Sequence, residues 1–189
     1  MTKTDPISDK PASRLSQIEA AANAYGLRSL DNYVQIRSVA ERLRDGLCAF
    51  LDDSRECVFL VPPQGGFSRK NYGSAAFSVS GKGVLPLEPI SFGLAVRVTE
   101  SDDYMRLVMT ARKAGDRIYI RAENKLTAEL NLPLKDENMM PVFESLTDYL
   151  LNWFQSRIDH YDDGDYGGTD IGFDILRVET TETPVPTLT

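Results

Sequence analysis

The chain has 189 residues, of which 42% are hydrophobic and 26% are charged, as is usual for a soluble globular protein. One domain is the natural expectation at this length, and such a chain can bury a substantial core. No stretch reaches the roughly 18 consecutive apolar residues of a membrane helix, and the first residues lack the apolar centre of a signal peptide. We therefore expect a cytoplasmic protein that does not contact the membrane.

The net charge of −7 is distributed unevenly along the chain. Residues 1–65 carry 8 basic and 9 acidic side chains, residues 66–125 carry 10 and 6, and residues 126–189 carry 3 and 13. Because an acidic protein is repelled by the phosphates of nucleic acid, a nucleic-acid partner is not expected. The basic middle and the acidic last third can instead neutralise one another within the fold.

Both ends of the chain are rich in Thr, Pro and charged residues and carry few large apolar side chains. We predict a disordered N-terminal arm over residues 1–12 and a flexible C-terminal tail over residues 179–189. A single α+β domain is expected between them, over residues 13–178.

Two helices are predicted near the N-terminus, over residues 13–25 and 30–51. Ser13 or Ser16 can cap the first helix, and Gly26 supplies the residue that ends it. In the second helix, apolar residues recur every three or four positions, which is typical of a helix packed on a sheet. The same stripe also allows pairing with another subunit.

The broadest apolar stripe follows Pro141, a residue tolerated in the first turn of a helix. Its spacing of three and four residues predicts a long helix from about residue 138 to residue 161, with the stripe facing the core. The members of the stripe are Phe143, Leu146, Leu150, Trp153, Phe154, Ile158 and Tyr161.

Strict alternation of apolar and polar residues between Ile90 and Ala122 predicts three antiparallel strands joined by polar turns. Further strands are predicted over residues 57–61, 75–80, 127–132 and 171–178. The expected fold class is therefore α+β with two layers. A mostly antiparallel sheet of about six to seven strands would carry the two N-terminal helices and the long C-terminal helix on one face.

Cys48 and Cys57 are the only cysteines. They are too few for a disulfide framework, and their spacing matches no metal site. Each lies among apolar neighbours, so we expect two buried free thiols.

The face of the sheet opposite the core is one candidate binding site. If the large apolar residues of the strands point inward, five basic or aromatic residues point outward. They are Arg97, Arg106, Arg117, Tyr119 and Arg121. Arginines beside an aromatic ring can hold a phosphate, a carboxylate or a stacked base. The alternative interpretation is an ordinary solvated face whose charges pair across strands.

The acidic, Gly-rich segment after the last predicted helix is a candidate metal site. Hard cations such as Ca²⁺ and Mg²⁺ take several oxygen ligands from a chain that folds tightly around them. In the register of an EF-hand loop, Asp159, Asp163, Asp165 and Asp170 take ligand positions, whereas Tyr161 stands where a carboxylate or amide is expected. The alternative interpretation is a solvated turn that ends the helix.

A third set, Asp102 and Asp103 followed by Glu123-Asn124-Lys125, resembles the core of the PD-(D/E)xK nucleases. The resemblance implies carboxylates that hold Mg²⁺ and a lysine that assists the attacking water. It covers only these few residues. The proline before the first aspartate is absent, and the strands concerned are predicted to be antiparallel.

No signature of nucleophilic catalysis is present, since His160 is the only histidine and lies in the acidic segment. We therefore expect a non-catalytic binding or adaptor domain that recognises a protein partner or a small anionic ligand. The contact would use the sheet face or the mobile loop Pro63–Gly73, and a homodimer is also allowed. The alternative is a metal-dependent hydrolase, or a Ca²⁺-binding protein, that uses Asp159–Asp170. No cofactor is firmly predicted, although Ca²⁺ or Mg²⁺ suits that segment.

Overall fold

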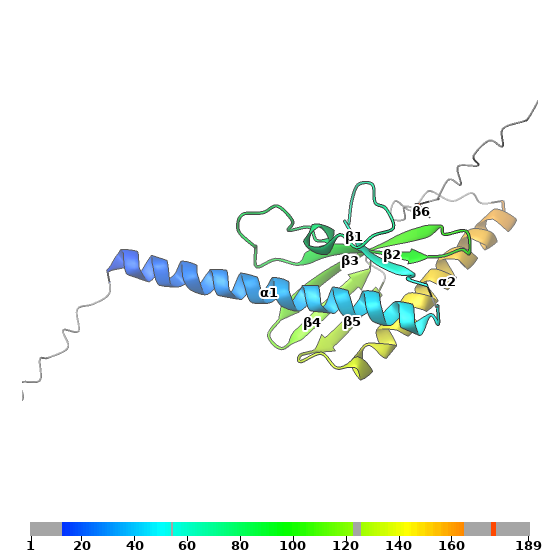
Figure 1. The fold of residues 1–189 in the computed structure, drawn as a ribbon. Helices are drawn as coiled ribbons and strands as arrows, with labels where there is room; N and C mark the ends of the chain where they lie inside the picture. The colour runs from blue at the N-terminus through cyan, green and yellow to red at the C-terminus, as the bar shows by residue number, and fades with distance from the viewer. Residues whose placement is uncertain (1–12, 54, 123–125, 165–174, 177–189) are drawn as a thin grey trace, which may run out of the picture.

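The computed structural model describes residues 13–53, 55–122, 126–164 and 175–176 (Figure 1). These residues form an antiparallel sheet, two α-helices and the segments that connect them, which confirms the predicted α+β class. Neither of the described helices is long and apolar enough to cross a membrane. The predicted N-terminal arm and C-terminal tail lie outside the described residues.

Five strands follow one another across the sheet in chain order, and each pairs antiparallel with the next. They are β1 (Val58–Val61), β2 (Ile90–Arg97), β3 (Tyr104–Ala114), β4 (Arg117–Ala122) and β5 (Leu126–Asn131). The two-residue β6 (Ile175–Leu176) pairs with the start of β3. The three alternating strands of the central region are thus confirmed. Of the strand predicted over residues 171–178, only β6 lies within the described residues.

The strand predicted over residues 75–80 is not formed. Gly73–Ala76 make a short 3₁₀ helix, η1, and a single bridge joins Phe77 to Phe92. Phe77 and Val79 are nevertheless buried in the core. Alternation in this stretch therefore reflects which side chains enter the core rather than pairing with a neighbouring strand.

The two helices predicted near the N-terminus are one continuous helix, α1 (Arg14–Phe50). The side chain of Ser13 caps it by accepting a hydrogen bond of 3.1 Å from the N–H of Ser16. Gly26 lies inside the helix and does not adopt the left-handed conformation that would end it. A single glycine costs about 1 kcal/mol relative to alanine, and the neighbouring alanines and the packing of the later turns outweigh this cost.

Only the second half of α1 covers the sheet. Its buried side chains are Ser29, Asn32, Ile36, Val39, Ala40, Leu43 and Leu47. The first half extends well beyond the sheet as a single helix (Figure 1), and Leu15 and Ile18 are 65% and 64% exposed. The spacing of three and four residues that buries the second half therefore continues into turns that have no sheet beneath them.

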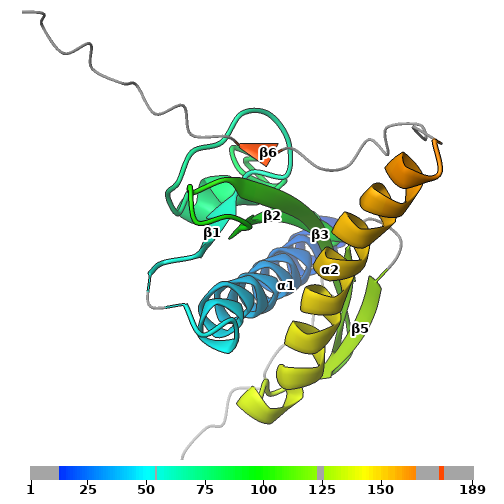
Figure 2. The ribbon, with the colours of Figure 1, turned by 90° about the vertical axis from the view of Figure 1, so that its right-hand side faces the viewer.

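The second helix, α2 (Met140–Asp162), lies on the same side of the sheet as α1 and packs against β5 (Figure 2). Pro141 stands in its first turn, as predicted. The side chains of Val142, Phe143, Leu146 and Leu150 are buried. The prediction that this buried stripe continues to Ile158 and Tyr161 is wrong. Those side chains are 53% and 67% exposed, because the last turns of α2 run past the strands (Figure 2).

Cys48 and Cys57 are joined by a disulfide, so the prediction of two free thiols is wrong. Cys48 lies in the last turn of α1 and Cys57 directly precedes β1, and their Cα atoms are 5.5 Å apart. This separation is within the range that a disulfide spans. The connection between α1 and β1 turns back on itself, and local sequence patterns do not reveal that proximity.

Candidate functional site

The outer face of the sheet is the one turned away from α1 and α2 (Figure 2). Strand β4 shows the alternation clearly, because Ile118 and Ile120 are buried in the main core whereas Arg117 and Arg121 are exposed. In β1, β2 and β3 the outward positions carry a second, smaller apolar cluster of Phe59, Val61, Ala95 and Tyr104. The pairing register of the strands places all five predicted residues on the outer face. Arg97 lies opposite Tyr104, and Arg106 lies opposite Ala95. The other three, Arg117, Tyr119 and Arg121, follow one another on the outer side of β4.

Arg106 is on this face but is covered, since only 5% of it is exposed. Its Nη1 donates hydrogen bonds to the carbonyl oxygens of Pro62 at 3.2 Å and of Gly65 at 2.6 Å. The ring of Phe67 lies 5.0 Å from the guanidinium carbon. The loop that follows β1, expected to be mobile, therefore folds over the sheet, and Arg106 fastens it there.

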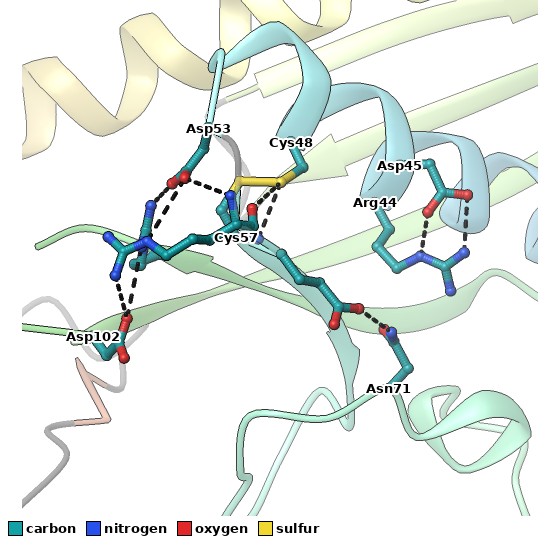
Figure 3. Close-up of a disulfide and its surroundings, with 10 residues drawn as sticks. Arg44, Asp45, Cys48, Asp53, Cys57, Asn71 and Asp102 are labelled. Atoms are coloured by element: carbon teal, nitrogen blue, oxygen red, sulfur yellow. Dashed lines mark hydrogen bonds and ion pairs between the residues drawn. A yellow bond between two sulfur atoms is a disulfide. The ribbon is translucent and has the colours of Figure 1, made fainter. Parts of the chain in front are cut away.

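Arg97 is also enclosed, with its side chain 10% exposed. It belongs to a group of charged residues that we call the corner cluster, consisting of Asp53, Arg55, Arg69, Arg97 and Asp102. Arg97 pairs with Asp53 through Nη2 (Figure 3). Arg69 Nη1 lies 2.6 Å from Asp102 Oδ2. Asp102 Oδ1 lies 3.7 Å from Arg97 Nη1 and 3.6 Å from Arg55 Nη1.

Two further features of this region are the backbone conformation of Asp102 and the burial of Tyr104. Asp102 has a left-handed backbone conformation, φ +65°, which is uncommon for a residue other than glycine. Tyr104, opposite Arg97 in the register, is only 3% exposed. Burial raises the pKa of its hydroxyl, and the charge of Asp102 raises it further. The corner cluster therefore holds Arg97 inside the protein rather than offering it to a ligand.

The remaining predicted residues stay accessible and form, with Arg112, what we call the outer strip: Arg112, Arg117, Tyr119 and Arg121. Arg112 faces Tyr119 across β3 and β4, and its guanidinium carbon lies 4.8 Å from the centre of the ring. Arg117 Nη1 lies 2.6 Å from Glu129 Oε1 on β5. The pKa of Arg117 is raised by its hydrogen bond to Tyr119 and by the charge of Glu129, so the guanidinium remains charged.

Arg112 was missed by the sequence reasoning, although the signal was present. In β3 the outward positions are even-numbered, and Arg112 has the same parity as Arg106. Side chains alternate between the two faces of a strand, so Arg112, six residues after Arg106, points to the same face and could have been predicted.

The acidic segment is described only in part. Asp159 lies in the last turn of α2 and Asp163 directly follows the helix, whereas Asp165 and Asp170 lie outside the described residues. Asp159 Oδ1 accepts a hydrogen bond of 2.8 Å from Gln155. A shallow hollow of about 420 Å³ runs along this side of α2, lined by Asn152, Gln155, Ser156, Asp159, His160 and Asp163. Within the part of the chain that the structure describes, no three His, Cys, Asp or Glu side chains gather as metal ligands do.

Of the residues that resemble a nuclease core, the structure describes only Asp102 and Asp103. Asp102 is bound to arginines of the corner cluster, and Glu123 and Lys125 lie outside the described residues.

The chain was compared with models of protein families, with curated proteins and with solved structures, and none of these matched it.

Proposed function

We propose that the chain is a non-catalytic binding domain that recognises an anionic group through the outer strip. A protein partner or a small ligand would present this group. The observation that carries the proposal is the arrangement of three exposed arginines around one half-buried tyrosine ring on two neighbouring strands. The three arginines are Arg112, Arg117 and Arg121.

The chemistry of the strip suits a carboxylate or a phosphate. A guanidinium group presents paired N–H donors that match two oxygens of such a group, and it remains charged at every physiological pH. Stacking of Arg112 on Tyr119 holds one of these donors in place before a ligand arrives, which lowers the entropy lost on binding. A basic strip on a protein of net charge −7 also gives an anion one preferred place to bind.

Thermal unfolding in the presence of defined anions tests the proposal. Inorganic phosphate, citrate and a short poly-glutamate peptide serve as probes of the two ligand chemistries. A probe at 100 times its Kd should add about 2.7 kcal/mol, or roughly 5–10 °C in Tm for a chain of this size. We expect a rise with at least one probe, and we expect the Arg117→Glu/Arg121→Glu variant to lose it.

A matched control separates the strip from overall charge. Lys82 and Arg14 are exposed and lie on other parts of the structure, so Lys82→Glu/Arg14→Glu changes the net charge by the same amount. The control variant should respond like the wild type. Equal responses of the wild type and the outer-strip variant to every probe would contradict the proposal.

The metal-dependent alternative has its own test. Asp159 and Asp163 are the described members of the proposed ligand set, and both stand at the end of α2. Unfolding is measured with Ca²⁺ and with Mg²⁺, with EDTA as the reference. A rise in Tm with one ion that is lost in Asp163→Ala would favour a metal-binding protein, whereas equal Tm values with both ions and with EDTA would count against it.

A further inference from the structure

The segment between the two cysteines is short and closed at both ends. Cys48 and Cys57 are nine residues apart in sequence, and their bond draws the end of α1 against the start of β1 (Figure 3). The N–H of Cys57 also donates to Cys48 Sγ at 3.0 Å. We call the described residues of this segment that follow α1 and its cap, Asp52, Asp53, Arg55 and Glu56, the tied loop.

Charged side chains from this loop contact three separate parts of the outer side of the sheet. Asp53 pairs with Arg97 on β2. Arg55 lies 3.6 Å from Asp102 in the turn between β2 and β3. Glu56 accepts a hydrogen bond of 3.0 Å from Asn71, in the loop that covers Arg106 (Figure 3). The tied loop thus supplies contacts that hold Arg97, Asp102 and the loop over Arg106 in place.

Arg97 depends on this loop for its best partner. Its Nη1 is buried and makes no hydrogen bond to the described residues, and the nearest carboxylate oxygen of Asp102 is 3.7 Å away. Its Nη2 is paired with Asp53. Withdrawal of Asp53 would leave a guanidinium group that is costly to keep buried, and the side chain would turn toward solvent.

The tied loop carries no core side chain, whereas Phe50 and Leu51, which precede it, pack against the main core. The main core joins α1 to β1 directly through residues such as Leu43, Leu47 and Leu60, which are all buried. The side chain of Arg55 is 53% exposed, and that of Asp53, which pairs with the enclosed Arg97, is 19% exposed. A segment held by a few ion pairs and one covalent bond can open locally at far lower cost than the whole domain.

We propose that the Cys48–Cys57 disulfide is a redox lock on the corner cluster. In the oxidised protein the tied loop keeps Asp53 on Arg97. In the reduced protein the loop is released, and Arg97 becomes accessible on the outer face. The inference is independent of which ligand the outer strip binds.

The reaction is a two-electron thiol–disulfide exchange with a dithiol reductant. Cys48 is half-buried whereas Cys57 is 1% exposed, so the attacking thiolate reaches the sulfur of Cys48. That attack forms a mixed disulfide and releases Cys57 as a thiolate, which takes up a proton. The second thiol of the reductant then displaces Cys48, so the chain gains two thiols and the reductant becomes a disulfide.

A first experiment counts thiols in the folded protein. The chain purified in air should show none, and treatment with dithiothreitol without denaturant should reveal two. Detection of two free thiols in the air-purified protein would overturn the proposal. So would a bond that dithiothreitol leaves intact while the protein is folded.

A second experiment measures the accessibility of Arg97. Phenylglyoxal modifies exposed arginines, and its rate at each arginine can be followed by mass spectrometry. The Cys48→Ser/Cys57→Ser variant represents the unlocked state without any added reductant. We expect Arg97 to react several-fold faster in this variant than in the oxidised wild type, because the loop that carries Asp53 is no longer tied by the disulfide.

Arg37 is the internal reference, because it pairs with Glu41 on α1, away from the tied loop. Its modification rate should stay the same in both proteins. Equal rates at Arg97 in the two proteins would overturn the redox lock. A parallel rise at Arg37 would overturn it as well, since it would show general loosening of the protein instead of release of the tied loop.

Discussion

Arg112 and Tyr119 face each other across β3 and β4, with the guanidinium carbon 4.8 Å from the centre of the ring. Neither side chain is buried in the core. The pair therefore adds little to the stability of the domain but fixes the direction of an exposed charge on the outer face.

A double-mutant cycle measures this contact. Arg112→Gln and Tyr119→Leu should each destabilise the protein slightly, and together by less than the sum, with a coupling of about 0.5–1 kcal/mol in urea unfolding. Arg28→Gln combined with Tyr119→Leu is the control, since Arg28 lies on α1 and its effect should simply add. A coupling near zero for the first pair would show that the stacked arrangement is absent in solution.

Two glycines of α1 should respond to alanine with opposite signs. A Cβ at Gly26 would meet nothing within 4 Å, whereas one at Gly46 would overlap the ring of Phe143 on α2. Gly26→Ala should raise the free energy of unfolding by up to about 1 kcal/mol through helix propensity. Gly46→Ala should lower it by about 1–3 kcal/mol through overpacking. Urea unfolding of both variants measures the two effects. Changes of the same sign in the free energy of unfolding would contradict the packing of α1 on α2.

The strands of the central sheet could be predicted because a period of two residues reports directly which side chains face the core. The end of the first predicted helix could not be placed in the same way. Gly26 is a good residue to end a helix and a tolerable one inside it, and the difference of about 1 kcal/mol is decided by turns that lie further along the chain.

The candidate site was predicted only in part for a similar reason. Parity along the strands places Arg97 and Arg106 on the outer face, where they lie. Whether an outward residue is accessible depends on which loops fold back over it. The carbonyl groups of Pro62 and Gly65, and the carboxylate of Asp53, come from segments with no periodic pattern. Contacts between segments so far apart in the chain cannot be predicted from local sequence patterns.

The first half of α1 should contribute little to stability. Leu15→Ala and Ile18→Ala remove exposed side chains, so each should change the free energy of unfolding by less than about 0.5 kcal/mol. Leu43→Ala removes a fully buried side chain from the same helix and should cost about 2–5 kcal/mol. The three variants are compared by urea unfolding. A cost clearly above that bound at Leu15 or Ile18 would mean that these turns are covered in solution.

Arg106 should be needed for the covering loop and not for binding. Arg106→Met keeps most of the side-chain volume but leaves the carbonyl groups of Pro62 and Gly65 without their donor, which should cost about 1.5–3 kcal/mol. Amide hydrogen exchange should accelerate in residues 62–72 and stay unchanged in β4. Arg121→Met, on the exposed outer strip, is the matched control and should remain within about 0.5 kcal/mol of the wild type. Unchanged exchange of the loop in Arg106→Met would show that this arginine does not fasten it.

Tyr104 should make the protein less stable at alkaline pH. Burial is the main cause that raises the pKa of its hydroxyl above the ordinary value of 10.0, and the charge of Asp102 adds to the effect. The folded protein therefore holds this proton more tightly than the unfolded chain does. The resulting stability is complete below about pH 10, the ordinary pKa of a tyrosine, and is lost as the pH rises from there through the raised pKa.

Urea unfolding across this alkaline range measures the effect. The free energy of unfolding should decline with pH in the wild type, and the decline should be shallower in Tyr104→Phe, which has no hydroxyl to ionise. Tyr161→Phe, which alters a side chain that is 67% exposed, should decline like the wild type. Identical pH profiles for Tyr104→Phe and the wild type would mean that Tyr104 titrates in the folded protein as it does in the unfolded chain.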